Sequence, residues 1–262
     1  MGTGLATIEA GRGGRPLLLV HGFTGAKEDF AEQLGPLAGA GWHAVAVDLP
    51  GHGESHPEGA TFGFDVYAAV VLALVDELGW SSFALLGHSM GGIVAQHVAL
   101  VAADRLTHLV LMDTTPGAVD IDGELLDLAC DLVADEGLPA LLEVQRALGG
   151  PLDTEPARRL RQQPGWQERS DAKFLRCSPE MYVTMARLLT SAPDRSTELA
   201  TIPVPTLVLV GEHDRLLLGP AEALASVIPD AKLTVVPDAG HSPQVESPDA
   251  WFQAVSAFLD GR

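Results

Sequence analysis

The chain has 262 residues, of which 47% are hydrophobic, and its 35 acidic and 16 basic residues give a formal net charge of −19. A chain of this length can bury a large core and commonly folds as one domain. The acidic excess argues against nucleic acid or an anionic membrane surface as a partner. Cys130 and Cys177 are the only cysteines, too few for a disulfide scaffold, and they favour a reducing, cytoplasmic setting.

Targeting and membrane signals are weak throughout the sequence. The segment 1–6 lacks the basic start and the apolar core of a signal peptide. The longest apolar stretches, such as 67–75, are shorter than the roughly 18 residues that a membrane span needs. We therefore expect a cytoplasmic protein with no membrane partner. The oligomeric state is left open.

Strand-like and helix-like segments alternate along the first 113 residues. The predicted elements are a strand at 17–20, a helix near 27–38, a strand at 43–47, a helix near 65–78, a strand at 82–86, a helix at 90–102 and a strand at 107–112. This alternation is typical of a parallel sheet with helices on both faces.

The alternation stops after residue 113. Between 114 and 199 no segment has strand character, and helical segments are predicted near 121–135, 138–148, 155–162 and 179–191. Strands at 206–210 and 232–236 and a helix near 247–260 then complete the pattern. We therefore predict a core formed by 1–113 and 200–262, with 114–199 as an all-helical cap, or lid, over the active edge of the sheet.

The pentapeptide Gly87-His88-Ser89-Met90-Gly91 stands between a predicted strand and a predicted helix. Gly-x-Ser-x-Gly in that context is typical of a nucleophile elbow, a sharp turn that lifts the serine oxygen clear of the sheet. The glycines allow the strained turn and a close approach of helix and strand. We therefore predict Ser89 as a nucleophile. A chance match in a chain with 28 glycines is the alternative.

An acid and a histidine follow two later strands. Asp214 and His241 each lie in a loop just past the carboxyl end of a strand, the edge where ligand sites form in open α/β sheets. His241 is predicted to take the proton from Ser89, and Asp214 to hold the imidazole in the required tautomer. Glu212 and Asp238 are the rival acids. The structural alternatives are a helix-capping role for Asp214 and a solvated loop position for His241.

With these three loops the chain resembles the α/β-hydrolase family over nearly its whole length. The resemblance implies a doubly wound, mostly parallel sheet with the cap inserted after the sixth strand. It favours Asp214 over its rivals because the family pattern Gly-x-x-Asp after this strand is matched here. It also implies an oxyanion hole formed by the backbone N–H groups of Phe23 and Met90. His21 is interpreted as orienting this loop without transferring protons.

Pocket residues are predicted less sharply than the triad. His88, Leu142 and Met185 are candidate substrate-pocket residues. Further cap residues either line the pocket or pack between helices: Leu125, Leu128, Leu132, Leu141 and Val144. No cofactor and no metal are expected, because His52 and Glu54 have no further spaced ligands around them. The glycine-rich segment 11–14 precedes a strand and so does not form a phosphate loop.

The resemblance implies a serine hydrolase that acts on a small, largely apolar carboxylic ester or lactone. Two other branches stay open: a carbon–carbon bond hydrolase of ring-cleavage products, and the menaquinone-pathway lyase that eliminates pyruvate. The lyase ranks lower because it typically has an arginine directly after the elbow glycines, where this chain has Ile93. Ser89 argues against epoxide hydrolases and haloalkane dehalogenases, which carry an aspartate there. A non-catalytic module that binds a small molecule is the remaining alternative.

Overall fold

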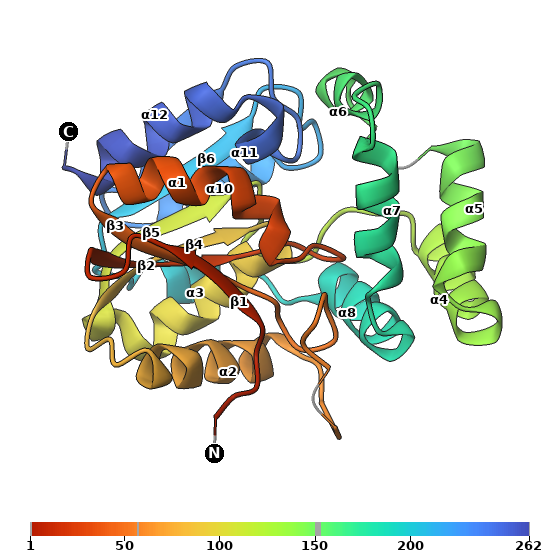
Figure 1. Cartoon of the computed structure of the whole chain (residues 1–262), viewed down its shortest axis with the longest axis horizontal. Helices are drawn as coiled ribbons and strands as arrows, with labels where there is room; N and C mark the ends of the chain where they lie inside the picture. The colour runs from red at the N-terminus through yellow and green to blue at the C-terminus, as the bar shows by residue number, and fades with distance from the viewer. Residues whose placement is uncertain (1, 57, 150–152, 262) are drawn as a thin grey trace.

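The computed structural model describes residues 2–56, 58–149 and 153–261, and it contains a seven-stranded sheet of order β1-β3-β2-β4-β5-β6-β7 (Figure 1). The strands are β1 Thr7–Ala10, β2 Arg15–Val20, β3 Trp42–Val47, β4 Phe83–His88, β5 Leu106–Met112, β6 Thr206–Gly211 and β7 Lys232–Val236. Only β1 is antiparallel to its neighbour in this sheet. The predicted doubly wound, mostly parallel sheet is confirmed.

Helices cover both faces of the sheet. One face packs against α1 (Ala31–Gly39) and α12 (Pro248–Leu259). The other packs against α2 (Phe64–Glu77), α3 (Met90–Ala102) and α10 (Leu218–Val227). Successive strand residues point to opposite faces, so Leu17 and Leu19 join the first apolar layer and Leu18 and Val20 the second. Apolar runs without alternation are therefore what a sheet covered on both faces requires.

All the helices and strands that the pattern predicted are present, with ends shifted by one or two residues. Several of the described elements were not predicted, among them one strand and one helix of the insertion. Strand β1 is short and half-exposed, so it lacks an apolar run. Helix α7 (Trp166–Leu175) buries only Asp171 and Phe174, so its apolar periodicity is weak. Both elements are defined by their packing partners more than by their own sequences.

An all-helical insertion separates β5 from β6. It contains α4 (Gly123–Glu136), α5 (Leu138–Leu148), α6 (Glu155–Arg161), α7, α8 (Pro179–Ser191) and α9 (Ser196–Leu199). The insertion follows the fifth strand and not the sixth as expected, because only β1 to β5 precede it among the described residues. Figure 1 shows α4 to α8 grouped beside one end of the sheet, with α4 and α5 farthest from it.

The insertion is held against the core by polar contacts to two loops. Lys173 of α7 pairs with Asp29 of the 3-10 helix η1 (Lys27–Phe30). Arg159 of α6 pairs with Asp238 at 2.6 Å, in the loop that also carries His241. The insertion therefore contacts both the β2–η1 region and the histidine loop. Among the described residues, no helix combines the length and the apolar character that crossing a membrane requires.

Candidate active site

Ser89 lies at a strained turn between β4 and α3. Its φ of 54° and ψ of −118° are rare for a residue with a side chain. A Cβ on Gly87 would come within 2.1 Å of the Gly91 carbonyl oxygen, and one on Gly91 within 2.4 Å of the His21 carbonyl oxygen. Only glycine fits at either position, because the clashing atoms are backbone. The sequence of the elbow therefore follows from the closeness of α3 to the ends of β2 and β4.

Ser89, His241 and Asp214 are brought together from three separate loops. His241 Nε2 lies 3.0 Å from Ser89 Oγ, and His241 Nδ1 donates to Asp214 Oδ2 at 2.6 Å. Because the carboxylate accepts from Nδ1, Nε2 of a neutral ring is free to accept the serine proton. Burial by itself would raise the pKa of Asp214, but the hydrogen bond and the charge of His241 hold that pKa below its ordinary value. The arrangement can therefore transfer a proton from Ser89 to an imidazole backed by a carboxylate.

The rival acids are occupied elsewhere. Glu212 Oε2 accepts from the backbone N–H of Asp238 at 3.0 Å, and Asp238 pairs with Arg159. Asp214 also accepts from the N–H of Leu217 at 3.2 Å, just before α10. The helix-capping alternative for Asp214 and its contact with His241 thus coexist on the two oxygens of one carboxylate.

The two backbone N–H groups predicted for the oxyanion hole are those of Phe23 and Met90. Within the described residues, neither Phe23 nor Met90 donates its N–H to a protein acceptor. Met90 is the first residue of α3, where helix N–H groups have no acceptor within the helix. The Phe23 loop is close, because a Cβ on Gly22 would lie 3.0 Å from Ser89 Cβ. An oxyanion hole formed by these two N–H groups stays a prediction.

His21 holds the Phe23 loop in place. Its Nε2 accepts from the N–H of Leu49 at 3.0 Å, and its Nδ1 donates to the Gly22 carbonyl at 2.8 Å. Complete burial lowers the pKa of His21, so the ring is neutral and both nitrogens are occupied. These contacts agree with the orienting role that was expected of His21.

The loop at 48–55 is a structural support. Asp48 is fully buried and accepts from the backbone N–H and the Nζ of Lys27, each at 2.7 Å. Glu54 accepts from the same Nζ at 2.7 Å, and the His52 ring lies 4.7 Å from that of His21. Among the described residues, the single group with metal-ligand spacing is another one, formed by Asp113, Asp214 and His241.

A small cavity adjoins Ser89. Its volume is about 10 Å³, comparable to the space that one water molecule occupies. It is lined by Ser89, Met90, Ile93, Asp113, Thr114, Thr115, Val119, Leu189 and Leu217. One side is therefore polar, from the ends of β4 and β5, and the other is apolar, with Leu189 contributed by α8 of the insertion.

The predicted pocket residues lie outside this lining. His88 donates from Nε2 to the backbone carbonyl of His241, and Leu142 and Met185 are buried in the apolar cluster that α5 and α8 share with the core. Leu125, Leu128 and Val144 are 60%, 68% and 42% exposed, so they neither line the cavity nor pack between helices. The reason is that α4 and α5 turn these positions toward solvent. Any role of Leu142 and Met185 toward a substrate stays a prediction.

Two residues at the site were missed by the sequence reasoning. Glu246, in α11 (Pro243–Glu246), accepts from the N–H groups of Gly240 at 2.6 Å and Ser242 at 3.1 Å, on both sides of His241. Asp113 lies directly after β5 and close to Asp214. A lone acid at the carboxyl end of a buried strand was the available signal for Asp113. Glu246 had no comparable signal.

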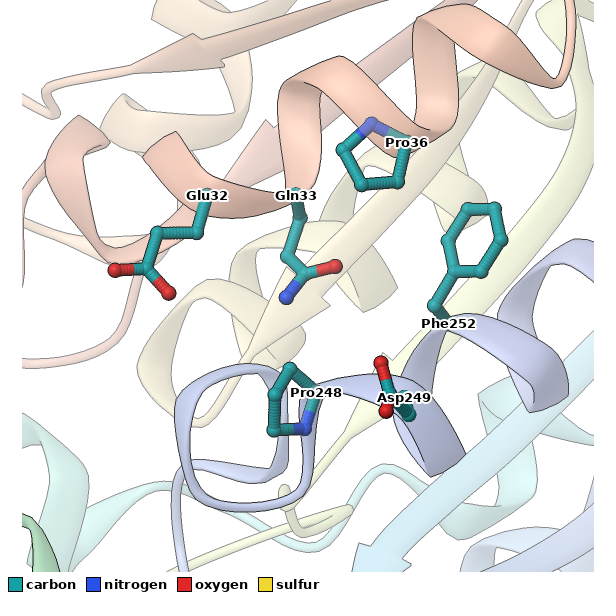
Figure 2. A pocket seen from close by; sticks show the side chains of 6 residues that line it. All are labelled: Glu32, Gln33, Pro36, Pro248, Asp249 and Phe252. Atoms are coloured by element: carbon teal, nitrogen blue, oxygen red, sulfur yellow. The ribbon is translucent and has the colours of Figure 1, made fainter.

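A second hollow lies between α1 and α12, and Figure 2 shows its six lining side chains. They are Glu32, Gln33, Pro36, Pro248, Asp249 and Phe252, around a volume of about 180 Å³. Gln33 is tied down by a hydrogen bond from its Nε2 to the Gln244 carbonyl at 2.8 Å. None of the predicted site residues lines this hollow, so it is separate from the elbow.

Fold and site together define an α/β hydrolase with a serine elbow. Residues 15–248 match the family model for the alpha/beta hydrolase fold, and the chain belongs to that family.

Two curated relatives match over most of this chain. The dihydrolipoyllysine-residue acetyltransferase component of the acetoin cleaving system of Pseudomonas putida is 33% identical over 95% of the chain, and the chain spans 64% of that relative's length. A Bacillus subtilis protein named as a candidate 2-succinyl-6-hydroxy-2,4-cyclohexadiene-1-carboxylate synthase is 28% identical over 93% of this chain and 89% of its own.

Solved structures share the fold over nearly the whole chain. A thermophilic esterase from Thermogutta terrifontis superposes with a TM-score of 0.84 at 31% identity, covering 98% of this chain and 93% of its own. An enol-lactonase from Burkholderia xenovorans LB400 reaches a TM-score of 0.85 at 24% identity, covering 98% and 96%. At 24% identity, the similarity to the lactonase is evidence for the fold and not for a shared activity.

Proposed function

We propose that the protein is a serine hydrolase that cleaves a small, largely apolar carboxylic ester or lactone through an acyl-enzyme on Ser89. The observation that carries this proposal is the contact of Ser89 Oγ with His241 Nε2 at 3.0 Å, with Asp214 2.6 Å from Nδ1 on the far side of the ring. A hydroxyl becomes an effective nucleophile only when such a base takes its proton.

The proposed reaction has two halves. In the first, His241 takes the Ser89 proton while Oγ attacks the substrate carbonyl carbon. The resulting oxyanion is stabilised by the N–H groups of Phe23 and Met90, which have no protein acceptor among the described residues. His241 then protonates the leaving alkoxide, and the acyl group stays on Ser89. In the second half, His241 takes a proton from water, the hydroxide attacks the ester carbon, and Ser89 recovers its proton as the acid leaves.

The cavity beside Ser89 supports a small acyl group. A volume of about 10 Å³ beside Ser89 accepts a group as small as a methyl, and a longer chain requires side chains to move. Ile93, Val119 and Leu189 make the far wall apolar. These features support a short, uncharged acyl group. The Thermogutta esterase at 31% identity supports ester chemistry in a fold of this kind.

The pyruvate-eliminating lyase is the second candidate. It is supported by the similarity to the Bacillus subtilis protein. Ile93 lines the cavity beside Ser89 at the position where the lyase typically carries an arginine. An apolar side chain there provides no anchor for an anionic substrate. We therefore rank ester or lactone hydrolysis first, and carbon–carbon bond hydrolysis has no specific observation in its favour.

The test is turnover of p-nitrophenyl acetate by the wild type, by Ser89→Ala and by Ser82→Ala, an exposed serine just before β4. Loss of the nucleophile is expected to lower kcat by about 10⁴-fold or more, and the Ser82 variant should match the wild type. A fluorophosphonate should add one covalent label, on the peptide that contains Ser89. The proposal is wrong if Ser89→Ala retains a tenth of the activity. Release of pyruvate from the substrate of the synthase named for the Bacillus subtilis relative, without ester turnover, would favour the lyase.

A further inference from the structure

Asp113 is a buried acid that the proposed reaction does not use. It follows β5, is fully buried, and has a φ of 45°, which is unusual for a residue other than glycine. Its Oδ1 accepts from the N–H of Gly211 at 2.9 Å. Its Oδ2 is buried and has no hydrogen-bond donor to accept from among the described residues. A buried polar atom without a hydrogen bond requires an explanation, because leaving it unpaired lowers the stability of the folded protein.

The neighbours of Asp113 are acidic. One side-chain oxygen of Asp113, one of Asp214 and one ring nitrogen of His241 all lie within 4.8 Å of one another. Glu246 lies near enough to act on Asp113 through its charge. Asp214 already accepts from His241 and from the N–H of Leu217. The unpaired Oδ2 of Asp113 therefore belongs to a side chain with acidic neighbours, and it has no donor among the described residues.

Two carboxyl groups so close together, away from water, cannot both be ionised at little cost. Burial, followed by the charge of Asp214, raises the pKa of Asp113 well above its ordinary value. The pKa of Asp214 moves in the opposite direction, because the hydrogen bond and the charge of His241 outweigh its burial. Opposite shifts in neighbouring acids assign the proton to one and the negative charge to the other.

We propose that Asp113 is a positioning residue that keeps its proton at neutral pH and donates it in a hydrogen bond from Oδ2 to the carboxylate of Asp214. This places a single negative charge behind His241. The geometry accounts for the orphaned oxygen, since an O–H at Oδ2 is a donor that needs the acceptor beside it. The inference rests on the proposed function, in that it assigns a partner to the triad acid.

The charge state of Asp113 has a consequence for the base. A second carboxylate within 4.8 Å would favour the imidazolium form of His241 and so weaken it as a base toward Ser89. A neutral carboxylic acid avoids this and still orients Asp214 by donating to it. A bound cation would have the reverse requirement, since it would need both carboxyl groups ionised.

The direct test is infrared difference spectroscopy of the wild type against Asp113→Asn at neutral pH. The wild type is expected to show a carbonyl stretch of a protonated carboxylic acid that shifts in D₂O and that the variant lacks. A difference containing only carboxylate bands would overturn the proposal, and would also be the result if a cation joined the two acids. If the variant does not fold, the carboxyl ¹³C chemical shifts of labelled aspartates in the wild type replace this comparison. One aspartate side chain should stay protonated at neutral pH, and a spectrum in which every aspartate is ionised would overturn the proposal. Neither measurement depends on turnover.

The pH dependence of kcat/KM on an ester is the second test. Asp113→Asn carries no charge and can donate from its amide to Asp214, so the acid limb should keep its midpoint. A shift of that limb to lower pH by about one unit or more would mean that Asp113 is ionised in the wild type. Asp113→Ala removes the donor and should move the limb to higher pH, because Asp214 is left to act on His241 alone. A purely structural role would lower stability without moving the limb.

Discussion

His88 Nε2 donates to the backbone carbonyl of His241 at 2.6 Å, so the residue just before the nucleophile holds the loop of the general base. The two rings lie 5.0 Å apart. A carbonyl can only accept, which places the proton on Nε2 and leaves Nδ1 unprotonated. Burial, together with the charge of His241, lowers the pKa of His88 to about 3. His88 is therefore a neutral link between the elbow and the histidine loop.

The first prediction is that His88 makes the protein sensitive to acid. The unfolded chain binds a proton at His88 below about pH 6.5, but the folded chain does so only near pH 3. Stability from this residue is therefore complete above that unfolded value and is lost as the pH falls toward 3. The slope is at most about 1.4 kcal/mol per pH unit.

Denaturant unfolding of His88→Gln across this range is the measurement. The free energy of unfolding of the variant should depend less steeply on pH than that of the wild type, whatever its absolute value. His56→Gln, at an exposed position, is the matched control and should keep the wild-type slope. Equal slopes for wild type and His88→Gln would show that His88 is not held neutral.

The second prediction concerns the triad acid. Asp214→Asn should lower kcat on an ester by about 10⁴-fold, because an amide facing Nδ1 favours the wrong imidazole tautomer. Glu212→Gln should change kcat little, since the Glu212 carboxylate accepts from the Asp238 backbone N–H and not from His241. Steady-state kinetics of both variants on one substrate decide. A large loss in Glu212→Gln with a small one in Asp214→Asn would reverse the assignment.

The third prediction tests the elbow. In Gly91→Ala the new Cβ would lie 2.4 Å from the His21 carbonyl oxygen, so the turn cannot be kept unchanged. We expect the free energy of unfolding to fall by about 3 kcal/mol, at the upper end of the range for overpacking. The variant should also have little ester turnover, because the elbow carries Ser89. Gly39→Ala, at the end of α1 where no atom lies within 4 Å, should be neutral or stabilising by up to about 1 kcal/mol. Equal stability of the two variants would argue against the packed elbow.

The fourth prediction concerns the attachment of the insertion to the core. The side chains of Lys173 and Asp29 are 27% and 14% exposed, whereas Arg176 and Glu28, 3.6 Å apart, are each 42% exposed. Lys173→Met leaves a mostly buried carboxylate without its cation and should cost about 1–3 kcal/mol. Arg176→Met should cost less than about 1 kcal/mol. Hydrogen exchange in α7 should rise in the first variant only, and the same rise in both would contradict the ranking.

The fifth prediction is about acyl length. Leu189 is the α8 side chain that lines the cavity beside Ser89, so Leu189→Ala should enlarge the space for an acyl chain. The ratio of kcat/KM for butyrate over acetate esters should rise by about tenfold, as expected for one or two methylenes in an apolar pocket. Leu128→Ala, at a side chain that is 68% exposed on the same insertion, is the control. An unchanged ratio in both variants would place the acyl chain elsewhere.

The features that could be predicted from the sequence are those that depend on neighbours along the chain. Apolar runs flanked by turn residues defined the central strands, and the glycines around Ser89 defined the elbow. They can do so because strand and helix periodicity and backbone strain are local properties. The all-helical character of the insertion was predictable for the same reason. Strand β1 and helix α7 were not, since their own patterns are weak.

Which side chains meet could not be predicted in this way, because it depends on how distant segments pack together. Asp214, and not Glu212, contacts His241, which lies 27 residues further along the chain. Asp113 lies beside Asp214 because β5 pairs in parallel with β6, with Met112 opposite Leu209, which brings both strand ends to one edge. Leu189 reaches the cavity while Leu128 faces solvent, although both lie in the same insertion. Strand register and helix docking set these distances, and both depend on packing between segments far apart in the chain.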